Sequence, residues 1–315
     1  MQAGHVLNQM DRRTGAAFGI RASASDPDQM NYPTPMESRR RHGSVEGVAG
    51  PLRAALPHQR YAAVLVGSSC ESNTARVDAR RRIGQLLEVQ FGHEEAVLEA
   101  AGADRAPIGA WAARDHIGHF GLWRTLFLTH LQALVAGGTP PDVPPDDLDA
   151  VNDRQIALDR EVSLEDLGSR WRTSWDGLRS WLTAASPADL ARAPRWYAAT
   201  SVAGALVRNS FTHPCGHLVD YYFERGQLDQ AADLADEMAA TVTELSELDF
   251  RFPAGAHVFA GVALALRGRP DEAMDALGRG VAMRPVNGPG LRDEITLASL
   301  RGRRDFEALT APIEQ

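Results

Sequence analysis

The chain has 315 residues, of which 44% are hydrophobic and 23% are charged. These are the proportions of a globular protein with an adequate core, so they exclude disorder along the whole length. The formal net charge is −8, and all 33 basic residues are arginine. An acidic chain without a basic face argues against sequence-independent binding of nucleic acid, which requires clustered positive charge.

Residue usage also bears on the compartment in which the protein works. The absence of lysine is typical of GC-rich bacterial genomes such as those of actinobacteria. The two cysteines, Cys70 and Cys215, make neither a disulfide framework nor a CxxC zinc site. The apolar run at 61–67 is far shorter than the ~20 residues that span a bilayer. We therefore expect a cytoplasmic protein that does not associate with membranes.

The N-terminal part differs in composition from the rest of the chain. Residues 1–75 are rich in Gly, Pro, Ser, Asp and Arg and lack a sustained apolar period of 3.6 residues. Such a segment buries too little apolar surface to offset the entropy lost on folding. A mostly disordered leader is therefore expected over residues 1–75.

Helical periodicity begins at Arg76. Apolar residues recur at helical spacing from Ile83 to Leu98 with charges between them, which predicts a helix that ends before Gly102. A second amphipathic pattern, rich in aromatic residues, predicts a helix over residues 108–135.

A proline-rich connection follows the second helix. The segment 139–147 contains four prolines, so it is expected to cross over without forming a helix. Ser163 and Asp166 then have the spacing of a capping box, with Asp in place of Glu. They predict the start of a third helix that continues to Leu182.

A fourth helix is expected over residues 200–225, with Gly226 at its end. No part of the chain shows the alternating pattern of a sheet. Four long helices with one crossover predict an all-α fold in which residues 76–226 form a four-helix bundle.

The sequence becomes repetitive after the bundle. Small residues recur at the same spacing around Gly226 and Gly268, 42 residues apart. This pattern is similar to the tetratricopeptide motif, in which paired helices touch at small residues. Its usual period is ~34 residues, so an inserted loop is expected around 248–255. Residues 227–315 are predicted to be a tetratricopeptide-like extension with a partial third unit at 302–309.

Histidines of the second and fourth helices are the candidate metal ligands. His213 and His217 are four residues apart, so both imidazoles lie on one helix face and can reach one ion at ~2.0–2.1 Å. A third ligand must come from another helix, which offers His119 and His116. Three neutral imidazoles leave a coordination position open, as catalytic sites require. By spacing alone, ordinary amphipathic or interface histidines are the alternative.

Several other residues of the fourth helix lie within one turn of the histidine pair in the sequence. Asn209 lies one turn before His213 and can orient a ligand or a water molecule, whereas an ordinary polar residue at the bundle end is the alternative. Asp220 can accept a proton, although an acid there is also typical of a solvated helix face. Cys215 points away from the histidines and is interpreted as a packing residue. Pro214 predicts a kink.

A family resemblance supports the histidine assignment. The run from Trp111 to His119, followed by Trp123, resembles the helix-two signature of the DinB/YfiT-like metalloenzymes, in which a Trp precedes a His eight positions on. The later parts of that family, particularly its ClbS/DfsB branch, resemble the stretches 147–153, 164–182 and 209–217. The resemblance covers residues 76–226 and implies a four-helix bundle with a long crossover. It implies three metal ligands, which are His119, His213 and His217.

The resemblance also implies a function. We expect a metal-dependent enzyme that transfers a thiol to a small molecule or hydrolyses one, with a low-molecular-weight thiol such as mycothiol as a cofactor. Zinc, nickel, manganese and iron all accept imidazole ligands, so the divalent ion stays open among these. One alternative is a non-catalytic scaffold that binds a protein or peptide through the C-terminal repeats. Another is a resistance protein that sequesters a small toxic molecule.

Overall fold

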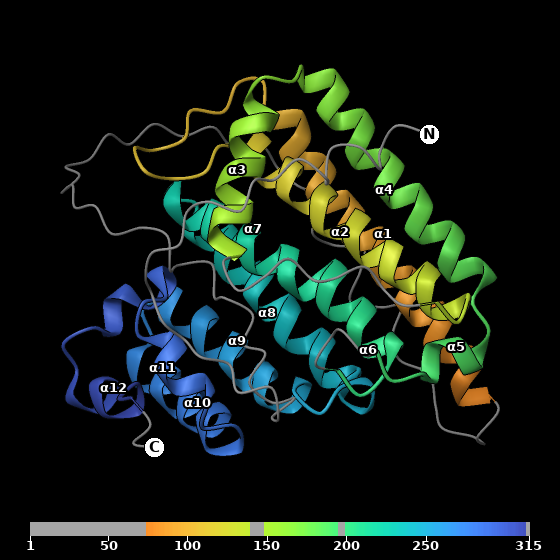
Figure 1. Ribbon diagram of the computed structural model, residues 1–315. Coiled ribbons are helices and arrows are strands. Elements are labelled where there is room, and N and C mark those ends of the chain that lie inside the picture. The colour runs from red at the N-terminus through yellow and green to blue at the C-terminus, as the bar shows by residue number, and fades with distance from the viewer. Residues whose placement is uncertain (1–73, 139–147, 195–198, 313–315) are drawn as a thin grey trace, which may run out of the picture. The chain divides into compact units, whose positions relative to one another are not determined.

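The computed structural model describes residues 74–138, 148–194 and 199–312. They belong to one compact unit, residues 32–315. Secondary structure in these ranges consists of helices, with no strand (Figure 1), which confirms the all-α class. The predicted leader lies outside the described residues except for Thr74 and Ala75, and the predicted crossover at 139–147 also lies outside them. None of the helices described has the length and apolar character needed to cross a membrane.

The first two helices are α1 (Thr74–Ala100) and α2 (Ala113–Val135). The prediction that the second helix starts at residue 108 was wrong. A turn with Gly109 at φ +84° precedes α2, and the Asp115 carboxylate accepts a hydrogen bond from the N–H of the residue before the helix. Trp111 therefore lies in the loop that leads into α2.

The next helix, α3 (Leu148–Arg160), was missed by the sequence analysis. Among its residues with described side chains, only Ile156 and Asp159 are buried, so its apolar period is weak. α3 lies against α2 (Figure 1), where a Cβ atom added at Gly118 would lie 2.3 Å from an Asp159 carboxylate oxygen. The glycine thus permits the close approach of the two helices.

The predicted third helix is α4 (Leu164–Ala184). Ser163 caps it as expected, because its Oγ accepts a hydrogen bond of 3.0 Å from the N–H of Asp166. α4 packs along α2. The short helix α5 (Pro187–Ala191) follows it.

The predicted fourth helix has three parts. They are α6 (Val202–Val207), a π-helical turn (Arg208–Thr212) and α7 (His213–Glu224). The π-helical turn ends at Thr212, two residues before Pro214, which lies in the first turn of α7. A proline ring collides with the carbonyl four residues back in a regular α-helix, and the wider turn relieves this conflict.

A buried ion pair ties the first helices together. The Glu94 carboxylate of α1 accepts two hydrogen bonds, of 2.7 and 2.9 Å, from the Arg124 guanidinium of α2, and both side chains are fully buried. The indole N–H groups of Trp171 and Trp175 in α4 also donate to Glu94. Since a buried charge is costly unless it is paired and hydrogen-bonded, this arrangement favours a single alignment of the three helices.

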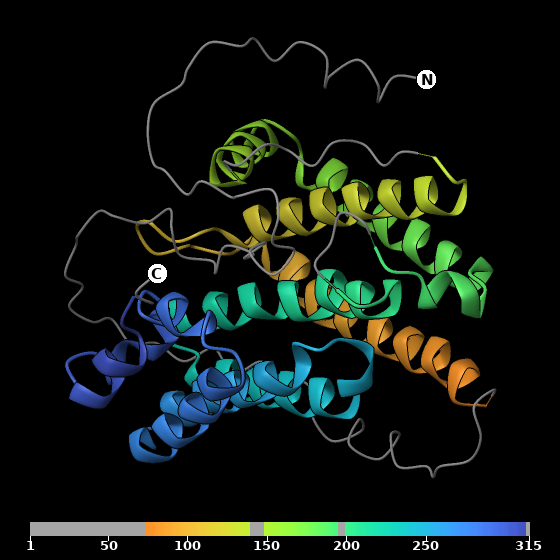
Figure 2. The ribbon, with the colours of Figure 1, turned by 60° about the horizontal axis from the view of Figure 1, so that its bottom comes forward.

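After α7 the chain forms α8 (Leu228–Glu244), α9 (Phe252–Leu266) and α10 (Pro270–Met283), of which α8 packs on α7, α9 on α8 and α10 on α9. Figure 2 shows α7 between α2 on one side and α8 on the other. Gly226 and Gly268, which carry the 42-residue spacing, adopt φ of +70° and +69° in the turns that end α7 and α9. The loop expected around 248–255 is shorter than predicted, because its last residues belong to α9. The short helices α11 (Asn287–Leu291) and α12 (Arg304–Leu309) follow α10 in the chain.

Candidate metal centre

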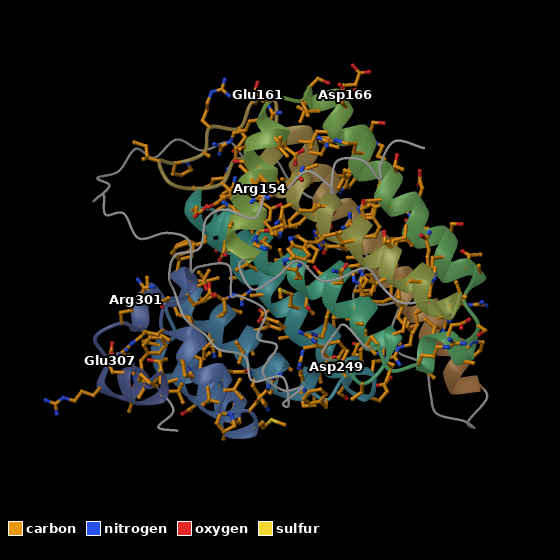
Figure 3. All side chains as sticks on the ribbon, in the orientation of Figure 1. Arg154, Glu161, Asp166, Asp249, Arg301 and Glu307 are labelled. Carbon is orange, nitrogen blue, oxygen red and sulfur yellow. The ribbon has the colours of Figure 1, made fainter. Side chains whose placement is uncertain are left out.

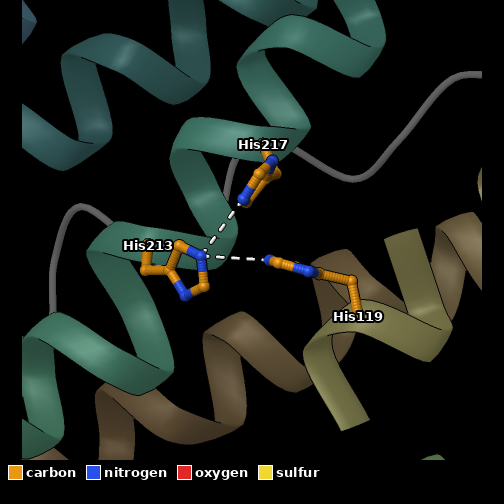
Figure 4. A group of neighbouring side chains, drawn as sticks. All are labelled: His119, His213 and His217. Carbon is orange, nitrogen blue, oxygen red and sulfur yellow. Dashed lines mark hydrogen bonds between the residues drawn. The ribbon is translucent and has the colours of Figure 1, made fainter. Parts of the chain in front are cut away.

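The structure brings three predicted ligands together (Figure 4). Nε2 of His213 lies 3.1 Å from Nε2 of His119 and 3.1 Å from Nε2 of His217. A ligand atom from each ring lies within 4.8 Å of those of the other two. His119 comes from α2 and the other two from α7, so the group joins two helices. His119 and His217 are buried, and His213 is partly buried.

The separation of these nitrogens fits one cation. Nitrogen ligands ~2.05 Å from a tetrahedral ion lie ~3.3 Å from one another. The two Nε2 contacts of 3.1 Å are close to that value. The group of three contains no carboxylate, so a divalent ion would keep its charge and have a coordination position open to a further ligand.

Burial keeps two of the imidazoles neutral. It lowers the pKa of His119 well below the ordinary 6.5, and the neighbouring His213 and His116 lower it further. Burial, together with the positive charges of Arg124 and Arg208, lowers the pKa of His213 to about 4. Neutral imidazole is the form that binds a metal ion. Both rings are therefore ready to bind a cation at neutral pH without first losing a proton.

Trp111 covers one side of the three histidines. Its indole stacks on the His217 ring, with ring centroids 5.4 Å apart and planes inclined by 11°, and meets the His119 ring edge-on at 5.1 Å. An ion pair holds the loop in place, because Arg225 bonds both the Asp104 carboxylate at 2.6 Å and the Trp111 carbonyl at 3.1 Å. Trp111 was predicted to lie in a helix, and the only sequence feature that pointed to a role at the site was its position eight residues before His119.

Asn152 of α3 also contacts the group. It forms a hydrogen bond with His119, and its Oδ1 accepts a bond of 3.0 Å from Nε1 of Trp123. An oxygen that accepts the N–H of one ring nitrogen fixes the tautomer and leaves the lone pair of the other nitrogen for a metal. Asn152 was not predicted as a site residue, because the only sequence feature that pointed to it was its place in the stretch 147–153.

The other candidates lie around this group. His116 is buried, and its ring meets that of Tyr221 edge-on at 5.5 Å. Asn209 is buried in the π-helical turn, where its Oδ1 accepts a hydrogen bond from the hydroxyl of the next residue. Asp220 is buried and hydrogen-bonds Glu294, which follows α11. The Asp220 carboxyl is therefore engaged with the C-terminal part of the chain.

Cys215 has the environment of a packing residue, as the sequence predicted. It is fully buried, and its Sγ donates to Oε1 of Gln90 at 2.9 Å. Burial raises the pKa of the thiol well above its usual range. Since the thiolate is the nucleophilic form, this thiol is unreactive at neutral pH.

The residues of the site favour the binding of one metal ion. Three buried or partly buried imidazoles, with one asparagine amide and one indole ring beside them, are suited to holding a single divalent ion. Their identities do not select among zinc, nickel, manganese and iron. In comparisons with known proteins, no family model, no curated protein and no solved structure matches this chain.

Proposed function

We propose that this protein is a metal-dependent enzyme of the DinB/YfiT-like group. Its single divalent ion would be held by His119, His213 and His217. The observation that carries the proposal is the convergence of three Nε2-bearing rings from two helices, at separations suited to one ion. α1, α2, α4 and the segment from α6 to α7 correspond to the four-helix bundle of that group. Residues 227–315 are its tetratricopeptide-like extension.

The residues around the histidines support a catalytic rather than a purely structural ion. A divalent ion with an open position acts as a Lewis acid and makes a water molecule or a thiol more acidic. Asn152 holds the ring of His119, and Trp111 stacks on His217, so both rings are oriented by neighbours. The proposed reaction is transfer of a low-molecular-weight thiol such as mycothiol to a small molecule, or hydrolysis of that molecule.

Metal analysis tests the ion. The purified full chain is exposed to zinc, dialysed and analysed by mass spectrometry, beside His213→Ala and the matched control His257→Ala in α9. We expect about one equivalent of metal in the wild type and the control, and almost none in His213→Ala. Near-zero content in both the wild type and His213→Ala would contradict the metal centre.

Cobalt substitution tests the open position and the thiol. Cobalt(II) replaces the ion, and the visible spectrum is recorded as a low-molecular-weight thiol is added. A new sulfur-to-cobalt band is expected if the thiol enters the open position. A spectrum that does not change would argue against thiol transfer and leave hydrolysis as the proposed reaction.

A further inference from the structure

Two indole rings lie beside the three histidines. Trp111 stacks on His217 and meets the His119 ring edge-on, with ring centroids 5.4 and 5.1 Å apart. Trp123 lies one turn further along α2 and meets the same His119 ring edge-on, with centroids 6.1 Å apart. Both tryptophans are partly exposed, as is His213. The metal centre is therefore flanked by two aromatic side chains that a molecule from solvent can reach.

The position of Trp123 is fixed by a hydrogen bond to α3. Its Nε1 donates to Oδ1 of Asn152 at 3.0 Å. Figure 3 shows the side chains of this region and labels Arg154, two residues further along α3. Since the only polar group of the indole is engaged in this bond, the ring offers its apolar surface to a ligand.

Gly216 leaves space beside the same histidines. It lies between His213 and His217 in α7, and a Cβ atom added to it would meet no atom within 4 Å in the described part of the chain. Its φ lies outside the left-handed region, so the backbone does not require glycine there. Pro214 and Cys215, on the other side of the helix, are buried. The side of α7 that carries Gly216 is therefore the side from which a ligand can approach the centre.

The charge of the centre decides which kind of group fits against the indoles. Indole rings attract cations as well as other flat rings. The group of three histidines contains no carboxylate, so a bound divalent ion keeps its positive charge and repels a cation close to it. An uncharged aromatic ring is accepted by both the ion and the indoles.

We propose that the substrate of the metal-dependent reaction proposed above, on which this inference rests, carries an uncharged aromatic ring next to the atom that binds the ion. Trp111 and Trp123 are the residues that select this ring. The ring enters beside Gly216 and lies against the indoles, while the neighbouring atom of the substrate takes the open coordination position. The two tryptophans thus determine specificity and take no part in bond making or breaking.

Hydroxamates test this selection, because they bind a zinc ion through the same pair of oxygens whatever group they carry. Isothermal titration calorimetry on the zinc-loaded full chain compares acetohydroxamate, which carries a methyl group, with benzohydroxamate, which carries a benzene ring. We expect benzohydroxamate to bind at least about tenfold more tightly. A saturated ring is not flat, so cyclohexanecarbohydroxamate should bind at least about threefold more weakly than benzohydroxamate.

Variants locate the contact with the ring. The ratio of the benzohydroxamate and acetohydroxamate affinities isolates this contact, since damage to the zinc site weakens both probes alike. The ratio should fall to about threefold or less in Trp111→Leu and in Trp123→Leu. It should fall likewise in Gly216→Leu, whose side chain fills the space beside the histidines. The control Trp181→Leu removes a partly buried indole of α4 and should keep the wild-type ratio.

Several outcomes would overturn the proposal. These are equal wild-type affinities for acetohydroxamate and benzohydroxamate, equal affinities for benzohydroxamate and its saturated analogue, and an unchanged ratio in both tryptophan variants or in Gly216→Leu. Acetohydroxamate binding without a preference for the ring would remove the aromatic substrate and leave the metal centre standing. If zinc-loaded wild type binds no hydroxamate at all, the open position is absent, and the proposed function fails together with this inference.

Discussion

Acid is expected to destabilise the metal-free protein through His213. Burial and the charges of Arg124 and Arg208 lower the pKa of this imidazole to about 4 in the folded chain, against 6.5 for an ordinary histidine. Above pH 6.5 neither the folded nor the unfolded state binds the proton. Between 6.5 and 4 the unfolded chain binds a proton that the fold excludes, so the free energy of unfolding falls as the pH falls. Below about 4 the loss is complete.

The size of the effect follows from the two pKa values. They differ by about 2.5 pH units, and each unit is worth about 1.4 kcal/mol, so His213 accounts for a loss of about 3 kcal/mol. The lowered pKa of His119 acts in the same direction. For a protein whose total stability is about 5–15 kcal/mol, such a loss is easily measured.

Urea unfolding followed by tryptophan fluorescence measures this loss. Wild type and His213→Gln are compared in a chelating buffer at several pH values between about 7.5 and 4. The wild type should lose about 3 kcal/mol more than the variant, because glutamine has no proton to gain. Parallel losses in the two proteins would refute the reasoning, since the imidazole would then not be the group that resists protonation.

Three further predictions concern the surroundings of the centre. Glu94→Leu leaves the buried Arg124 charge unpaired and should cost about 3–5 kcal/mol in urea unfolding, whereas the double variant with Arg124→Met should recover the part due to the charge but not the part due to the two indole N–H groups left without an acceptor. A Cβ at Gly118 collides with the α3 carboxylate, so Gly118→Ala should destabilise the fold by about 1–3 kcal/mol, whereas Gly92→Ala, which meets no atom within 4 Å, should not. Asn152→Ala should lower zinc affinity about 10–100-fold in a chelator competition assay without unfolding the chain, and unchanged affinity would remove its orienting role.

The features that could be predicted from the sequence are those set by local spacing. The apolar period from Ile83 to Leu98 indicated a helix, and the pair Ser163 and Asp166 marked a helix start, because both signals lie within a few residues. The pairing of His213 and His217 in α7 could be predicted for the same reason, because the two residues are only four positions apart. The choice of His119 as the third partner came from a family resemblance, and the structure brings it to the other two.

The features that were missed depend on contacts between distant segments. α3 buries little apolar surface, so its sequence has no clear helical period of apolar residues. Because the helix was not predicted, Asn152 was not placed beside His119. The position of Trp111 depends on a turn and on Arg225, which is far away in sequence and bonds both Asp104 and the Trp111 carbonyl.

α6, the π-helical turn and α7 form one continuous helical segment. The turn determines the direction in which the side chains of α7 point relative to those of α6. Before the turn, α6 is docked through Gly204 on the Leu248 backbone, and after it α7 directs His213 toward α2. Each residue of an α-helix advances the chain by about 100°, so an extra residue in the turn rotates the side chains of α7 by that amount relative to those of α6. A chain shorter by one residue within 208–212 could satisfy the docking or the histidine cluster, but not both at once.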